Sequence, residues 1–286
     1  MRRLLAAHLP DAAALSLRAV PSPGTDNALW RVGEALVLRV PRRAEAVAPF
    51  LKEMRWLPQL GGLPLRVPEV VVSGRSDDLA HGVFGVLRWI GGDVAPADAL
   101  ADPTRAAIDL AAFLRALRQV PTQGAPAAGA ANHYRGVPLH RMEARLHAAL
   151  DALEDEIDGP AAHALWRASC AVPADGQGVW LHGDLKDDNL IAHDGALAGV
   201  IDWGLAAVGD PAADTMAAWT WCTPAARAAF RTALAPSEAE WCRARGWALY
   251  AAAIALSYYR TRGHADLCRL SRRTLRRLGV APTDPL

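Results

Sequence analysis

The hydrophobic pattern of the first ninety residues or so is mostly that of β-strands, with loose alternation at 15–20, and one segment departs from it. Short apolar runs, rich in Val and Leu, are separated by turn residues such as Arg75-Ser76-Asp77-Asp78. Between residues 44 and 60, Phe50, Met54 and Leu57 fall instead at the spacing of one helix face. The pattern predicts the order three strands, one helix, two strands, with strands over 15–20, 28–32, 35–40, 68–73 and 82–90.

After Gly91-Gly92-Asp93 the chain becomes Ala-rich and takes the period of helices. A stretch rich in Gly, Ala and Pro at 123–131 predicts a mobile loop, and residues 179–203 form a non-helical island with strands over 190–192 and 197–202. Helices are predicted over 104–120, 140–157, 161–170, 212–221, 238–259 and 265–278.

These patterns predict an α+β chain of two lobes with a cleft between them. The N-terminal lobe, residues 1–90, has a small five-stranded antiparallel sheet and one main helix. A hinge at about 87–92 leads to a larger, mostly helical lobe, residues 91–286. Small-molecule sites tend to lie in such clefts, so we expect the site between the lobes.

Composition narrows the classes of function. The 286 residues are 52% hydrophobic, which supports a sizeable core and excludes wholesale disorder. The formal net charge is +1, so the chain has no global field for nucleic acid or an anionic membrane. The four Cys form no C-x-x-C pair, and the longest apolar run, 247–259, is too short for the ~20 residues that a bilayer requires. A cytoplasmic protein with free thiols, monomeric or weakly dimeric, is expected.

The island carries the candidate chemistry. It contains His182-Gly183-Asp184-Leu185-Lys186-Asp187-Asp188-Asn189 and then Val200-Ile201-Asp202-Trp203-Gly204. Phosphoryl transfer needs a carboxylate near the attacking hydroxyl and oxygen ligands that hold Mg²⁺ against the phosphates. The spacing from Asp184 to Asn189 matches the kinase catalytic loop, and a hairpin returns Asp202 beside it. Asp184, Asn189 and Asp202 are therefore predicted to converge on one point.

On these motifs the sequence resembles the aminoglycoside phosphotransferase family, the small-molecule branch of the protein-kinase-like fold. Further support comes from Gly209-Asp210-Pro211-Ala212-Ala213-Asp214 and from the N-terminal segments 24–32 and 36–41. The resemblance implies that Asp184 is the catalytic base and that Asn189 and Asp202 bind Mg²⁺. It also implies a phosphate-covering loop with Ser22, Gly24 and Asn27, and a hinge, Leu87-Arg88-Trp89-Ile90, that hydrogen-bonds the base of ATP or GTP. Asp210 and Asp214 would be structural acids.

Two positions depart from the family pattern. Arg39 stands where a Lys is usual on the third strand, with Glu53 as its expected partner. Lys186, two residues after Asp184, is one of only two Lys in the chain and is expected to neutralise charge on the γ-phosphate. The other, Lys52, is expected to be a surface charge.

The acceptor is the open question at this level. The first hypothesis is an antibiotic such as an aminoglycoside, with phosphorylation giving resistance. The second is a metabolic alcohol of the choline, sugar or amino-alcohol type, and the third is an inactive nucleotide-binding module, suggested by Arg39. A polycationic acceptor would need an acidic pocket, although charge runs of this kind are usually solvated helix faces. The candidate acids are Asp151, Glu154, Asp155, Glu156, Asp158, Glu238 and Glu240.

Overall fold

The N-terminal part of the chain is built around one antiparallel sheet. The computed structural model describes residues 1–21, 26–174 and 176–281. Within them the sheet has the strand order β1-β2-β3-β5-β4, and every neighbouring pair is antiparallel. The strands are β1 (Leu17–Val20), β2 (Asn27–Val32), β3 (Leu36–Pro41), β4 (Val70–Arg75) and β5 (Val83–Arg88). The predicted order of three strands, one helix and two strands is confirmed.

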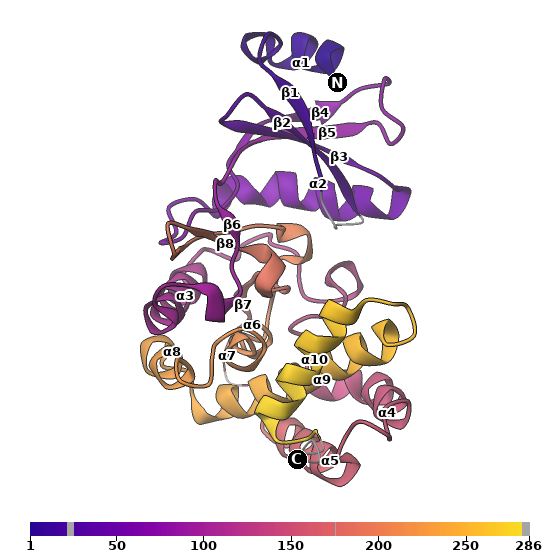
Figure 1. Cartoon of the computed structure of the whole chain (residues 1–286), viewed down its shortest axis with the longest axis vertical. Coiled ribbons are helices and arrows are strands. Elements are labelled where there is room, and N and C mark those ends of the chain that lie inside the picture. Colours follow the sequence, from indigo (N-terminus) through magenta and orange to yellow (C-terminus); the bar gives the residue numbers. More distant parts are fainter. Residues whose placement is uncertain (22–25, 175, 282–286) are drawn as a thin grey trace.

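The central strand β3 is buried along its whole length because a helix covers each face of the sheet. Helix α1 (Arg2–His8) places Leu4 and Leu5 against one face, and α2 (Val47–Trp56) packs on the other (Figure 1). Gly85 of β5 allows α2 to approach closely, since a Cβ there would lie 2.6 Å from the Met54 sulfur. The predicted helix over 44–60 is α2 with a 3₁₀ turn at each end. Helix α1 was not predicted.

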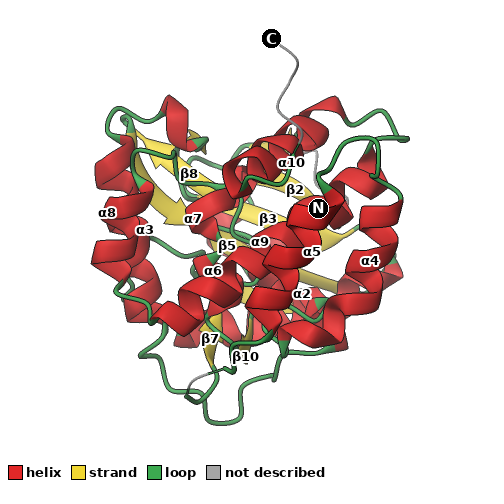
Figure 2. Ribbon diagram, turned by 90° about the horizontal axis from the view of Figure 1, so that it is seen from below, coloured by secondary structure: helices red, strands yellow, loops and turns green. Residues whose placement is uncertain are grey.

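The C-terminal part consists mainly of helices arranged around α9. Helix α9 contacts α4, α5, α6, α7 and α10, while α3 packs on α8 (Figure 2). The predicted bounds of α9 and α10 are confirmed to the residue, and α8 was not predicted. The helices are α3 (Pro103–Leu117), α4 (Glu143–Asp151), α5 (Gly159–Cys170), α6 (Ala212–Thr215), α7 (Ala217–Thr220), α8 (Arg227–Leu234), α9 (Glu238–Tyr259) and α10 (Ala265–Leu278).

Two of the helix predictions need correction. The segment 140–157 is not one helix: a 3₁₀ turn, Leu139–Met142, precedes α4, and turns follow Asp151. The segment 212–221 is the two short helices α6 and α7, which are separated at Met216. In both cases the apolar spacing continues across a point where the helical conformation is interrupted, so the periodicity overestimated the length of the helix.

Two small sheets lie beside the helices and frame the 179–209 region. The hairpin of β8 (Leu190–His193) and β9 (Ala196–Val200) is extended by β6 (Asp93–Val94). The pair of β7 (Val179–Leu181) and β10 (Ala207–Gly209) is antiparallel and was not predicted. The 182–189 loop therefore begins at the end of one sheet and ends at the start of another.

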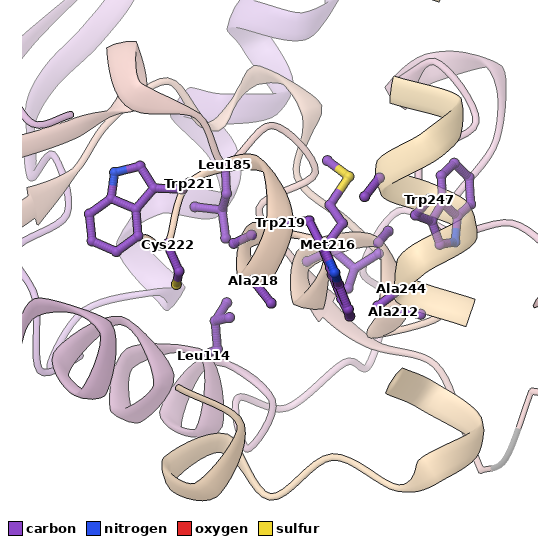
Figure 3. Packing of buried hydrophobic residues seen from close by; sticks show 14 of the residues in the cluster. Leu114, Leu185, Ala212, Met216, Ala218, Trp219, Trp221, Cys222, Ala244 and Trp247 are labelled. Atoms are coloured by element: carbon purple, nitrogen blue, oxygen red, sulfur yellow. The ribbon is translucent and has the colours of Figure 1, made fainter. Parts of the chain in front are cut away.

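A continuous hydrophobic core connects the two parts of the chain. It joins Val37, Phe50 and Met54 of the upper sheet and α2 to the helices below. Figure 3 shows a portion in which Leu185 of the 182–189 loop belongs to the same cluster as Leu114 of α3 and Trp221. The predicted fold class, a small antiparallel sheet with one main helix beside a larger helical part, is confirmed. Among the described helices, none combines the length and apolarity required to cross a bilayer.

Candidate active site

A buried carboxylate holds the start of the 182–189 loop. Asp214 of α6 accepts hydrogen bonds from the backbone N–H groups of His182, at 2.7 Å, and Gly183, at 2.8 Å. Gly183 has a φ of +82°, and a Cβ there would lie 2.8 Å from the carbonyl oxygen of Leu205. The loop therefore has one conformation that only a glycine fits without strain. This geometry is the structural role that was expected for Asp214.

The imidazole of His182 joins the loop to the segment that precedes Asp202. Its Nε2 lies 3.0 Å from the carbonyl oxygen of Ile201, and its Nδ1 lies 3.2 Å from the backbone N–H of Asp184. These partners assign the proton to Nε2, because a carbonyl only accepts and Nδ1 must accept from the amide. The ring packs edge-on against Trp203, with centroids 4.7 Å apart. His182 therefore links the backbone at Asp184 to the backbone at Ile201, just before Asp202.

Asp184, Asn189 and Lys186 form one polar cluster. The Asn189 Nδ2 donates to the carbonyl oxygen of Asp184 at 2.8 Å and to its Oδ2 at 2.9 Å. The Lys186 Nζ lies 3.1 Å from the same Oδ2. Burial alone would raise the pKa of Asp184, but the charges of Lys186 and Arg135 outweigh it and lower that pKa. The Asp184 carboxylate is therefore ionised near neutral pH.

Asp202 presents a second carboxylate to the same region from a strained backbone. Its φ is +66°, an uncommon value for a residue other than Gly and one that tends to occur at functional sites. Desolvation by the surrounding protein raises the pKa of the Asp202 carboxyl. The negative charges of Glu53 and Asp184 raise this pKa further, whereas the positive charge of Arg39 lowers it. Solvent reaches the Asp202 side chain. Within the described residues, its carboxylate accepts no hydrogen bond.

Arg39 and Glu53 form a buried ion pair with two hydrogen bonds, as the sequence predicted. The two Nη atoms of Arg39 lie 2.7 and 2.9 Å from the two carboxylate oxygens of Glu53. Glu53 also accepts from the backbone N–H of Trp203 at 3.2 Å. The pair therefore links β3, α2 and the residue after Asp202. Arg39 Nε is buried with no protein partner, which leaves one donor available.

The donor set around Asp202 fits a divalent cation that shares its ligands with a nucleotide. The side-chain oxygen of Asn189 remains available because its Nδ2 makes the bonds to Asp184. Over the described ranges, no three His, Cys, Asp or Glu side chains gather as a complete metal site. Mg²⁺ is usually held by one or two carboxylates together with substrate phosphates and water. The chemistry of Asp202 and Asn189 therefore fits the protein's share of such a site.

The described residues predicted to contact the nucleotide lie on or next to the interior strands β2, β3 and β5. Ser22 and Gly24 are outside the described residues. Asn27 opens β2, and its side-chain oxygen is buried without a partner. In the predicted hinge, the backbone N–H of Arg88 donates to Glu69 at 2.8 Å and that of Trp89 donates to Ala35 at 2.8 Å. Any base contact by the hinge must therefore use its other backbone groups.

Sequence reasoning missed the segment at 129–135. Buried Asn132 accepts from the Gly129 N–H at 2.8 Å and donates to the Arg135 carbonyl at 2.7 Å. This closes a turn in which His133 and Tyr134 have φ values of 54° and 63°. The following residue, Arg135, is close enough to Asp184 to lower the pKa of that carboxyl. No motif marks this turn; the only sequence signal is a polar Asn-His-Tyr-Arg cluster after an Ala-rich run.

Lys52 is not the surface charge that was expected. It is half-buried, its Nζ donates to the carbonyl oxygen of Ala131 at 3.2 Å, and burial lowers its pKa to about 8. The side of α2 that carries Lys52 is therefore contacted by the 129–135 turn, which sequence spacing on α2 does not reveal.

Five of the seven acids considered for a cationic-substrate pocket have contacts of their own, and the other two are exposed. Glu156 pairs with Arg260 and Arg272, and Asp155 also pairs with Arg260. The remaining acids are either in helix-end contacts or exposed: Asp158 caps α5, Glu238 pairs with Arg231, Glu240 pairs with Arg118, and Asp151 and Glu154 are exposed.

Two arginine contacts complete the frame around the loop. Asp210 pairs with Arg243 of α9 at 2.8 and 3.0 Å, and Asp210 also accepts from the Ala212 N–H. Arg273, on the Arg-rich face of α10, lies 3.3 Å from Asp187. Both acids therefore act as structural anchors of the loop.

The sheet with α2, the helical part and the Asp184–Asn189–Asp202 arrangement define a protein-kinase-like phosphotransferase of the small-molecule type. The model of the phosphotransferase enzyme family matches residues 18–268, and the chain belongs to that family. No curated protein matches the chain by sequence.

Solved structures with this fold include three that cover nearly the whole chain. Wild-type aminoglycoside 2'-phosphotransferase-IIIa in its GDP complex has a TM-score of 0.70 at 18% identity, over 97% of each chain. The streptomycin–ATP ternary complex of APH(2")-IIa has a TM-score of 0.62 at 18% identity, over 93% of this chain and 96% of that one. Macrolide 2'-phosphotransferase MphH from Brachybacterium faecium has a TM-score of 0.62 at 22% identity, over 99% and 97%. At these identities the likeness establishes the fold.

Proposed function

We propose that this chain transfers the γ-phosphate of magnesium-bound ATP or GTP to a hydroxyl group of a small molecule. The observation that carries the proposal is the polar cluster in which Asn189 and Lys186 hold the ionised Asp184. The charge of Asp184 is in turn close enough to Asp202 to add to the effect of burial in raising the pKa of that second carboxyl. The Asp184 carboxylate is thereby available to an acceptor hydroxyl, while the Asp202 carboxylate is available to a cation.

Each side chain has a distinct role in this proposal. Asp184 orients the acceptor hydroxyl and takes its proton, since its lowered pKa keeps it in the basic form. Asn189 and Asp202 would hold Mg²⁺, which neutralises phosphate charge when it is bound. Lys186, 3.1 Å from Asp184, is close enough to the reacting groups to stabilise charge on the γ-phosphate.

The nucleotide would lie against the sheet. The loop with Ser22, Gly24 and Asn27 covers the phosphates, and the unpartnered Asn27 oxygen and Arg39 Nε are the polar atoms that support this placement. Glu53 fixes the Arg39 guanidinium from the opposite side. The hinge, with Arg88, Trp89 and Ile90, would border the base. The domain boundary near residue 90 stays a prediction.

Two classes of acceptor follow from the family. Antibiotics come first, because the neighbouring structures are titled as aminoglycoside and macrolide phosphotransferases. A metabolic alcohol of the choline, sugar or amino-alcohol type is the second candidate. An inactive nucleotide-binding module is disfavoured because Arg39 forms the ion pair with Glu53 that an active site of this class requires.

The test uses three Asp→Asn variants with equal changes in charge. Asp184→Asn should bind magnesium nucleotide by calorimetry yet turn over acceptors about 10²–10⁴-fold more slowly. Asp202→Asn should lose magnesium-dependent binding. Asp188→Asn is the matched control, since Asp188 lies in the same loop but is exposed. Wild-type protein that binds no magnesium nucleotide, or equal turnover in wild type and Asp184→Asn, would refute the proposal.

A further inference from the structure

A cavity of about 270 Å³ lies where the 129–135 turn meets α4 and α9. Ala130 and six larger side chains line it: three basic, two aromatic and one branched aliphatic. We call it the arginine pocket and define it by His133, Tyr134, Arg135, Arg145, Tyr250 and Ile254. No Asp or Glu belongs to this lining. The volume is just below the ~300–1,000 Å³ of typical small-molecule sites, so it suits one end of a ligand.

Among the residues that the structure describes, no Asp or Glu hydrogen-bonds either arginine of the pocket. Arg135 Nε and Nη1 are buried without any hydrogen-bond partner. Its guanidinium lies 5.9 Å from the Tyr250 ring centroid, and that of Arg145 lies 5.0 Å from the Tyr134 ring centroid. Among the described residues, no ion pair involves Arg145. Buried donors without partners are costly, and a guanidinium matches a carboxylate or phosphate with two parallel hydrogen bonds.

The pocket adjoins the proposed catalytic base. The residue after Arg135, Gly136, accepts from the Asp210 N–H at 2.8 Å, and a Cβ on it would lie 2.3 Å from Leu181. The turn is therefore pressed against the paired strands β7 and β10, and the 182–189 loop begins directly after β7. The influence of Arg135 on the pKa of Asp184 agrees with this closeness. A ligand bound to Arg135 in the pocket would consequently lie near Asp184.

The backbone conformation of the 129–135 turn preorganises Arg135 for ligand binding. The side chain of Asn132 bonds to both ends of the turn, and His133 and Tyr134 take left-handed backbone conformations. Such conformations persist only where the surrounding structure enforces them, and they concentrate at functional sites.

We propose that the arginine pocket binds an anionic group of the acceptor, so that the substrate is a hydroxyl-bearing acid with a carboxylate or phosphate group. This rests on the proposed function. In the reaction, the acceptor oxygen forms a bond to the γ-phosphorus while the bond from that phosphorus to the bridging oxygen breaks. The hydroxyl proton passes to Asp184, and the nucleoside diphosphate leaves. A polycation would instead meet the charges of Arg135 and Arg145, which disfavours an aminoglycoside.

The test is an acceptor panel in matched pairs, assayed with magnesium ATP and magnesium GTP and scored by mass spectrometry for a gained phosphoryl group. Aliphatic and aromatic hydroxycarboxylic acids are paired with their primary amides, and hydroxyl-bearing phosphate monoesters with the parent alcohols. An aminoglycoside and a macrolide complete the panel. We expect kcat/KM for the charged member to exceed that of its neutral partner by about tenfold or more. The carboxylate and phosphate arms identify which anion is used.

Two variants separate anion binding from a general effect on the base. Arg145→Gln should reduce the charged-to-neutral ratio of kcat/KM about tenfold, mainly through KM. Arg141→Gln is the matched control, because Arg141 is exposed, lies four residues earlier and is outside the pocket. Arg135→Gln should reduce the same ratio. If Arg135 served only to lower the pKa of Asp184, its replacement would reduce kcat/KM equally for charged and neutral acceptors.

The outcomes distinguish this inference from the proposed function. The inference alone would be overturned if the enzyme phosphorylated the amides, the parent alcohols or the aminoglycoside at least as well as the acids, provided that this activity required Asp184. Magnesium-nucleotide binding without turnover of any acid, or a ratio unchanged in both Arg145→Gln and Arg135→Gln, would also overturn it. Failure to bind either magnesium nucleotide would overturn the proposed function as well.

Discussion

At position 39 an arginine forms the buried ion pair with Glu53 that was expected of a lysine. A lysine would offer one ammonium group to both a phosphate and Glu53. The guanidinium instead uses both Nη atoms on Glu53 and retains Nε. The pair is buried, so its energetics differ from those of a surface ion pair.

Removing one member of this pair should destabilise the protein strongly. Arg39→Met leaves the Glu53 carboxylate buried and uncompensated, and we expect a loss of about 3–5 kcal/mol in the free energy of unfolding. The double variant Arg39→Met/Glu53→Leu should recover part of this loss because no charge stays buried. Arg18→Met is the control: its pair with Glu34 is exposed and should contribute at most about 1 kcal/mol. Urea titration measures all three, and equal losses for Arg39→Met and Arg18→Met would contradict the argument.

Lys52 should make stability depend on pH in the alkaline range. Its pKa is lowered from 10.5 to about 8 by burial, so the unfolded chain binds the proton more tightly. The free energy of unfolding should therefore rise as pH increases from about 8 to 10.5, and the lysine should cost stability below that window. Lys52→Met should remove this rise and gain about 1 kcal/mol at pH 7, after a discount for partial exposure.

The control for Lys52 is Arg55→Met on the same helix. Arg55 is exposed and stays charged throughout this range, so its removal should leave the rise in stability intact. Denaturant titrations at pH 7.5 and 9.5 give the comparison. A wild type and a Lys52→Met variant with the same pH slope would show that Lys52 is not desolvated.

At the scale of elements, length and periodicity decide what the sequence can predict. The long helices α9 and α10 have many turns of repeated pattern, and their bounds were predicted to the residue. Helix α1 has seven residues and no side-chain cap, so it carries too little signal. Strands β7 and β10 have three residues each, and their pairing is created by tertiary contacts.

The candidate site likewise contains residues that local sequence could predict and residues that it could not. The spacing of Asp184, Asn189 and Asp202 is local in sequence, and so is the hairpin that joins them, which made this cluster predictable. The contribution of Arg135 depends on a turn that is closed by Asn132 and pressed onto β10. Nothing within a few residues of Arg135 indicates that contact, so its place beside Asp184 required the fold.

The catalytic loop should be more sensitive to an added methyl group than other turns with the same backbone angle. Gly183 and Gly82 both have positive φ, but only Gly183 has a carbonyl, 2.8 Å away, in the path of a Cβ. Gly82→Ala should cost about 1 kcal/mol, the conformational penalty alone. Gly183→Ala should cost roughly 2–4 kcal/mol and lower kcat/KM, since a displacement of ~1 Å near the reacting groups can cost 10²-fold. Equal effects of the two substitutions on kcat/KM would argue against a rigid loop.

At the scale of the whole molecule, the proposed ligand site lies where the two parts of the fold are joined. Glu53 of α2 contacts Arg39 of the sheet and the backbone N–H of Trp203. Trp203 in turn packs on Phe113 of α3, with centroids 6.0 Å apart. A nucleotide held between Arg39 and Asp202 would therefore bridge the sheet and the helical part. Such a ligand should stabilise both parts together instead of one alone.

Magnesium nucleotide should accordingly raise the thermal stability of the whole chain in one transition. A ligand at 100 times its Kd stabilises the native state by about 2.7 kcal/mol. Differential scanning calorimetry should show a single peak that moves upward with magnesium ATP or magnesium GTP and returns when EDTA removes the metal. Asp202→Asn should lose the shift, whereas Asp188→Asn should keep it, because the exposed Asp188 carboxylate is outside the proposed ligand set. Two peaks, of which only one moves, would mean that the nucleotide binds one part of the fold without engaging Asp202 and Arg39 together.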